Sequence, residues 1–150
     1  MAEFLLVMHA LSAAAWIGGA LLTGFAGPRM ARAGAEPFLG WARVAAEAGA
    51  KYFNPVGALT ALSGIGLVLV SGQYDWGDTF VSIGLAVVVA TAVIGAVVQR
   101  PGGKKVVAAL EAANYTEAAN EGKKVAIGGA ISMALLIVAV IVMVLRTGST

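Results

Sequence analysis

The only histidine of this 150-residue chain, His9, is the one ionisable side chain within four long apolar stretches. Ser12 and Trp16 follow it at i, i+3 and i+7, so all three side chains share one face of a helix. An ionisable side chain inside an apolar helix is costly and marks a functional site by default. Three roles are open for His9: ligation of haem iron or copper by a neutral imidazole, a proton-sensitive switch, or a hydrogen bond to a neighbouring helix or to water.

Ligation at His9 is constrained by the other donors of the chain. There is no second histidine and no cysteine, which excludes a bis-histidine haem within one chain and any cysteine-ligated metal. Met8 projects about 100° away from His9 on a helix, so these neighbours cannot readily share a metal. Met143, in the last apolar stretch, is the methionine that could lie at the depth of His9, and His/Met ligation of haem exists. Alternatively, the second ligand could be His9 of another copy or a residue of another subunit.

Catalytic motifs are otherwise missing from the sequence. Gly122-Lys123-Lys124 resembles the end of a phosphate-binding loop, but Glu117 stands where the first glycine should be. The sequence has no nucleophile–base pair, no cluster of metal-ligating residues and no paired carboxylates within an apolar stretch. We therefore expect no catalytic residue and no metal site other than the possibilities at His9.

The elements that must position His9 are four hydrophobic helices. The chain is 59% hydrophobic and 12% charged, against about 25% charged residues in ordinary soluble domains. Each apolar stretch has close to the ~20 residues that cross a hydrocarbon core as a helix. The sequence predicts an all-α bundle of four transmembrane helices in one domain covering 1–150, with spans at 4–26, 55–71, 80–98 and 125–145.

The positive charges predict how the bundle is oriented. Nine of the ten basic residues lie in the two long loops, whereas the short turn between the second and third spans carries Asp75 and Asp78. Cytoplasmic loops of membrane proteins are enriched in Lys and Arg. We expect both long loops to be cytoplasmic and both termini to lie outside. A net charge of +2, confined to loops, gives no indication of nucleic-acid binding.

Each long loop is predicted to carry a short amphipathic helix on the membrane surface, one at 37–52 and one at 104–113. In the first, apolar residues recur at helical spacing after Pro37, a residue favoured in the first turn of a helix. Gly27-Pro28-Arg29 and Arg100-Pro101-Gly102 are interpreted as the stops of the first and third spans, because proline interrupts helices.

Small and hydroxyl-bearing residues predict where the spans touch, because helices in lipid associate through close packing and polar contacts. They could pack the bundle itself or dock a different protein. The predicted contact positions, including one tryptophan, are Ser12, Trp16, Gly19, Gly64, Gly84, Thr91, Gly95, Gly128 and Ser132.

The stretch from His9 to Gly19 resembles the H-x6-W-x-G-G opening of small bacterial inner-membrane proteins, the copper-resistance-D-like and related uncharacterised four-helix families. Pro55 and Leu62-Ser63-Gly64 are also similar to that group. The resemblance implies a multi-pass protein of the bacterial inner membrane and, for some branches, copper handling or haem binding. The implied ligand would fall on His9 alone, because the further histidines of metal-handling branches are missing here.

The sequence as a whole favours a non-enzymatic membrane protein that binds other membrane proteins, as an accessory or stabilising subunit of a larger transport or respiratory complex. Its partners would be the lipid bilayer and other subunits, or further copies of itself. The alternative is a haem- or copper-binding membrane protein that uses His9, with haem b as its cofactor.

Overall fold

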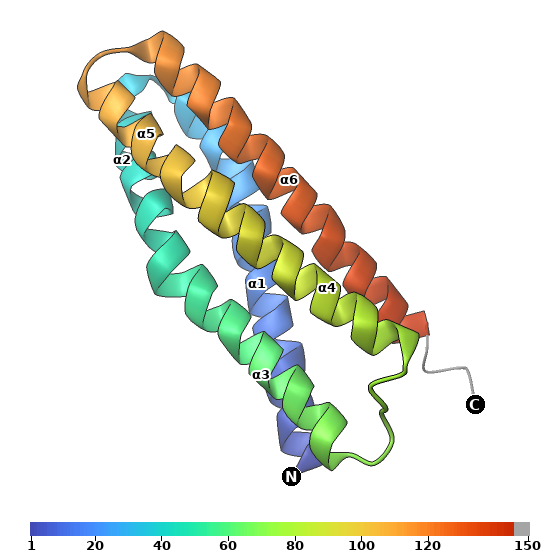
Figure 1. Cartoon of the computed structure of the whole chain (residues 1–150). Coiled ribbons are helices and arrows are strands. Elements are labelled where there is room, and N and C mark those ends of the chain that lie inside the picture. Colours follow the sequence, from blue (N-terminus) through green and yellow to red (C-terminus); the bar gives the residue numbers. More distant parts are fainter. Residues whose placement is uncertain (146–150) are drawn as a thin grey trace.

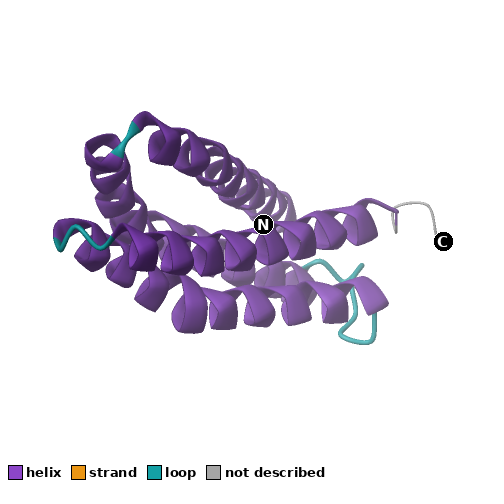
Figure 2. Ribbon diagram, turned by 90° about the horizontal axis from the view of Figure 1, so that it is seen from above, coloured by secondary structure: helices purple, strands orange, loops and turns teal. Residues whose placement is uncertain are grey.

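The computed structural model describes residues 1–145, and every regular element in that range is a helix (Figures 1 and 2). Four of the resulting helices are long and apolar enough to cross a membrane, as the sequence predicted. The elements in chain order are α1 (Ala2–Ala33), α2 (Ala35–Ala48), η1 (Gly49–Phe53), α3 (Asn54–Val70), α4 (Thr79–Ile94), η2 (Gly95–Gln99), α5 (Arg100–Glu111) and α6 (Tyr115–Leu145).

Two wide π-helical turns, η1 and η2, join α2 to α3 and α4 to α5 without interrupting either helix. The Asn54 N–H donates to the Gly49 carbonyl, and the Arg100 N–H donates to the Gly95 carbonyl, five residues back in each case. Pro55 and Pro101 come directly afterwards. A proline ring clashes with the carbonyl four residues before it, and it lacks an N–H to bond there. A turn widened by one residue accommodates that carbonyl, so each helix continues past its proline.

The prediction of surface helices was wrong in one respect. Helices form close to both predicted positions, but each continues a span and is not a separate short helix. The combined helices cover 36 residues at 35–70 and 33 residues at 79–111. At 1.5 Å per residue they are about 50 Å long, against a hydrocarbon core of about 30 Å. About 20 Å of each therefore extends beyond the hydrocarbon.

The two predicted stops were also wrong. Pro28 lies inside α1, which continues to Ala33, and Arg100-Pro101-Gly102 forms the start of α5. The fourth long helix begins at Tyr115, well before the expected start at residue 125. The wide turn η2 accommodates Pro101, which explains why the chain stays helical there.

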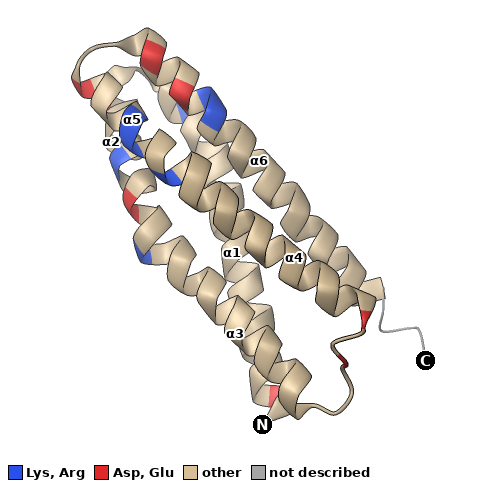
Figure 3. Ribbon diagram, in the orientation of Figure 1, with Lys and Arg blue, Asp and Glu red and all other residues tan. Residues whose placement is uncertain are grey.

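We call the part of the bundle beyond the hydrocarbon the head: α2, α5, residues 27–33 of α1 and residues 115–124 of α6. Its core consists of small and aliphatic side chains that α2, α5 and α6 contribute together. These are Ala42, Val106, Ala109, Leu110 and Ala118, with Phe38, Leu39 and Val107 packed against them. Lys and Arg residues gather at this end of the ribbon, as Figure 3 shows.

The remainder of the bundle consists of two antiparallel helix pairs, α1 with α3 and α4 with α6 (Figure 1). The pairs meet where Trp16 and Ile17 of α1 pack against a core of Val87, Leu136 and Ala139. Large aliphatic side chains cover the outside, as lipid contact requires; Leu62, for example, is 67% exposed. The N-terminus and the end of α6 lie at the end opposite the head.

Candidate functional site

His9 lies against α3 at a glycine. Its Nδ1 is 2.8 Å from the Thr60 carbonyl oxygen and 3.4 Å from the Ser63 hydroxyl. A Cβ added at Gly64 would lie only 2.9 Å from Cε1 of the imidazole. Glycine at position 64 therefore allows the ring to reach the backbone of α3.

The contact with Thr60 determines which ring nitrogen of His9 carries the proton. A carbonyl oxygen can only accept, so Nδ1 must be the donor. In the neutral imidazole, Nε2 then keeps its lone pair. Within residues 1–145, Nε2 has no hydrogen-bond partner. The site thus presents one imidazole nitrogen that can accept a hydrogen bond or ligate a metal.

Two further rings repeat the arrangement of His9 along the contact between α1 and α3. Trp16 lies over Gly57, where an added Cβ would be 3.0 Å from the edge of the indole. In the reverse direction, the Tyr52 ring lies over Gly19 of α1, 2.5 Å from an added Cβ. The Tyr52 hydroxyl also donates to the Ala15 carbonyl at 2.6 Å. We call these three contacts the ring–glycine seam.

The spacing along α1 explains why the seam forms. Leu5, His9, Ser12, Trp16 and Gly19 alternate by four and three residues, the repeat that keeps one stripe facing an adjacent helix. Leu5 extends the seam beyond His9, onto Gly66. Ser12 is buried within it and donates to the His9 carbonyl of its own helix at 3.1 Å.

The predicted contact residues of the other pair lie mostly between α4 and α6. The methyl group of Met143 would be 2.9 Å from a Cβ at Gly84. Gly128 faces Val98, 3.1 Å from an added Cβ. Ser132 is buried and accepts a hydrogen bond of 3.5 Å from the Gln99 amide.

Two predicted contact positions make no hydrogen bond or close contact to the facing helix that the structure describes. Thr91 is buried, but its hydroxyl donates to the Val87 and Val88 carbonyls of its own helix. Gly95 opens η2, and a Cβ there would meet no atom within 4 Å. Gly95 also has helical dihedral angles that any residue adopts (φ −58°, ψ −46°), so neither its backbone conformation nor a close helix contact requires glycine there.

The residues fit a haem only in part. His9 offers one axial nitrogen, whereas Met143 packs on α4 and not on α3, where the imidazole lies. Among residues 1–145, no group of three or more His, Cys, Asp or Glu could hold a metal ion. A haem at this site would therefore take its second axial ligand from another chain or from a small molecule.

Sequence reasoning missed the partners of His9 and the role of Tyr52. The acceptor for His9 is a backbone carbonyl, which leaves no trace in side-chain types. Tyr52 lay in the expected surface helix, but η1 turns it toward α1. The sequence did contain a signal for the contact face of this helix. Within 53–67, Gly57, Thr60 and Gly64 are spaced by three and four residues, which keeps them on one face.

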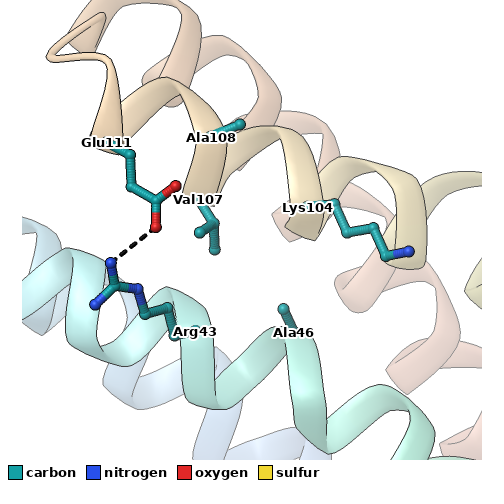
Figure 4. A pocket seen from close by; sticks show the side chains of 6 residues that line it. All are labelled: Arg43, Ala46, Lys104, Val107, Ala108 and Glu111. Atoms are coloured by element: carbon teal, nitrogen blue, oxygen red, sulfur yellow. Dashed lines mark hydrogen bonds and ion pairs between the residues drawn. The ribbon is translucent and has the colours of Figure 1, made fainter.

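A second site is a groove of about 270 Å³ on the head, between α2 and α5 (Figure 4). Ala46, Val107 and Ala108 form its apolar floor. The end farther from the spans is closed by an ion pair of 2.8 Å between Arg43 and Glu111. Lys104 lines the other end, and Figure 4 shows its side chain extending away from that ion pair.

The charges near this groove are unequally compensated. Lys51 donates to Glu47 at 2.6 Å, and this hydrogen bond holds the pKa of the Glu47 carboxyl below its usual value. Glu47 is therefore ionised at neutral pH and offsets Lys51. Lys104 and Arg100 lie one turn apart on α5, and neither has an acidic partner within the described part of the chain. The membrane-proximal end of the groove is consequently cationic.

No protein-family model, curated protein or solved structure matches the chain. The functional argument therefore depends on the geometry of the two sites.

Proposed function

We propose that this four-span membrane protein is a non-enzymatic accessory or stabilising subunit that binds other membrane proteins. The ring–glycine seam is the observation that supports the proposal best. His9 Nδ1 and the Tyr52 hydroxyl are polar groups that could take part in chemistry. Here both form hydrogen bonds that hold α1 against the helix formed by η1 and α3. Polar contacts between helices stabilise a bundle in lipid, where leucine gains nothing over the lipid tails.

The head supplies the surface for the partner. It extends the bundle by about 20 Å beyond the hydrocarbon on helices that are continuous with the spans. Val44, on α2, is 60% exposed there, although lipid tails do not reach it. An apolar side chain exposed outside the bilayer is typical of a surface that another protein covers.

The distribution of charge supports an orientation for the head. It carries eight of the ten basic residues. Lys51 lies next to it in η1, and Arg146 lies outside the described residues. By the positive-inside rule the head faces the cytoplasm, and the N-terminus and the turn at 71–78 lie outside. The resemblance to the copper-resistance-D-like families supports a place in a bacterial inner membrane, with further subunits or copies as partners.

The test of this function is the size of the assembly that mild detergent extracts from native membranes. We expect the protein in an assembly larger than its own monomer and Val44→Lys largely released from it. Asn120→Lys, which adds the same charge at an exposed position of α6 in the head, is the matched control and should stay in the assembly. Recovery of the unaltered protein as a free monomer in several mild detergents would reject the proposal.

Haem binding is the second candidate function, and the tautomer of His9 favours it. Because Nδ1–H is held by the Thr60 carbonyl, Nε2 is oriented and has its lone pair available. A bound haem b would add one-electron redox chemistry. In that case His9 Nε2 would hold the haem, and His9 of a second copy or a residue of another subunit would provide a further ligand.

An absorption spectrum of the protein purified from haem-replete cells separates the two functions. A Soret band that disappears in His9→Ala but persists in Ser12→Ala would establish haem binding through His9. A colourless preparation would reject it and leave the accessory role as the only proposed function.

A further inference from the structure

The end of the groove that Lys104 lines is the end nearer the spans. Gly103 of α5 faces Ala46 of α2, with 3.7 Å between an added Cβ and the Ala46 Cβ. From this contact, η1 and η2 lie within two turns in the direction of the spans. The apolar floor thus starts at the level where the helices leave the hydrocarbon and enter the headgroup region.

The cations of α5 are directed to the same level. Side chains on a helix lean toward its N-terminus, and the N-terminus of α5 is its membrane-proximal end. Figure 4 shows Lys104 extending in this direction. Arg100 lies one turn closer to the spans on the same face, so the two charges frame the mouth of the groove.

From this arrangement we infer that the mouth of the groove binds the headgroup of an anionic phospholipid. The phosphate, or a second acidic group of the headgroup, would contact the Lys104 ammonium and the Arg100 guanidinium. The upper part of an acyl chain or the glycerol would lie near Ala46 and Val107. Basic pockets between helices at the membrane surface have the charge and position that such headgroups require.

The charge pattern distinguishes this occupant from others. A second protein docking on the groove would have to cover the closed Arg43–Glu111 end as well, whereas a lipid needs only the open, cationic end. A soluble anion would be attracted by the same cations, but it would gain nothing from the apolar floor. A neutral headgroup lacks the net charge that two uncompensated cations favour.

The experiment is a titration of the purified full-length chain in a nonionic detergent with phosphatidylglycerol, followed by native mass spectrometry. We expect Lys104→Gln to bind about fivefold more weakly, the loss typical of one basic residue near an anionic surface. Lys104→Arg should restore binding, because it keeps the charge. Phosphatidylcholine should not compete with phosphatidylglycerol.

Lys123→Gln is the matched control. Val125 of α6 packs on Gly102 of α5, so Lys123 lies at nearly the same height as Lys104 on a different helix. Lys123 is exposed, and Lys123→Gln removes the same charge as Lys104→Gln. Binding should stay within about twofold of the unaltered chain, since only long-range attraction is lost.

Three results would overturn the inference. An equal loss in Lys104→Gln and Lys123→Gln would show diffuse attraction without a site. Equal binding of phosphatidylcholine would show that the headgroup charge is not recognised. Displacement of the lipid by millimolar inorganic phosphate would assign the cations to a soluble anion.

Discussion

Three glycines in the spans allow the helices to pack closely, because each leaves room for a ring from the adjacent helix. His9, Trp16 and Tyr52 reach the backbone of the facing helix only where a Cβ is missing. Van der Waals packing and interhelical hydrogen bonds drive helix association in lipid, where burial of apolar area gives little net gain. The seam therefore determines both the register of α1 against α3 and the orientation of the imidazole.

Gly64→Ala tests this at the contact that holds the imidazole. The added methyl would lie 2.9 Å from His9 Cε1 and displace the ring from the Thr60 carbonyl. Overpacking of this kind typically costs about 1–3 kcal/mol, so the thermal midpoint in detergent should fall clearly. Gly18→Ala is the control, because a Cβ there meets nothing within 4 Å. Equal midpoints for the two variants would mean that the seam does not hold the helices together.

At the scale of the elements, the two π-helical turns give the molecule its shape. Each replaces the break expected at a proline and carries the helix on into the head. Both follow the same pattern, Gly-Ala, four further residues and Pro, at 49–55 and 95–101. As a result α2 and α5 pack against each other and share a core, which short surface helices lying flat would not do.

A disulfide between Ala46→Cys and Gly103→Cys tests the pairing of α2 with α5. The Cβ positions are 3.7 Å apart, within the range that a disulfide spans. Since the natural chain has no cysteine, the crosslink should form on mild oxidation and be the only one. Gly40→Cys with Gly103→Cys is the matched control, because Gly40 has no neighbour within 4 Å of an added Cβ. Efficient crosslinking of the control pair, or none in the test pair, would argue against a rigid head.

The sequence predicted the helices better than the way in which they connect and pair. Apolar length alone identified four spans, because a bilayer requires about 20 residues of any apolar type. The prolines misled at Pro28 and Pro101, because the rule that proline ends a helix is local. Here the packing of α2 on α5 stabilises the widened turns. The acceptor of His9 was unpredictable for a related reason: single-sequence patterns do not say which helices are neighbours.

The whole molecule has two regions in different solvents. The four spans expose aliphatic side chains and belong in hydrocarbon, while the head carries most of the charge and belongs in water (Figure 3). This division underlies each proposal: the imidazole inside the spans, the apolar residue Val44 on the head, and the cationic groove at the boundary. It also implies that the head and the turn at 71–78 are on opposite sides of the membrane.

Single-cysteine labelling in intact cells tests that division most directly. Cysteines at Ala33 and Asn120, on the head, should react with a membrane-impermeant maleimide only after the cells are opened. A cysteine at Asp75, in the opposite turn, should react in intact cells. Equal labelling of all three positions in intact cells, or of Asp75 and Asn120 from the same side, would contradict a bundle that spans the bilayer with its head in the cytoplasm.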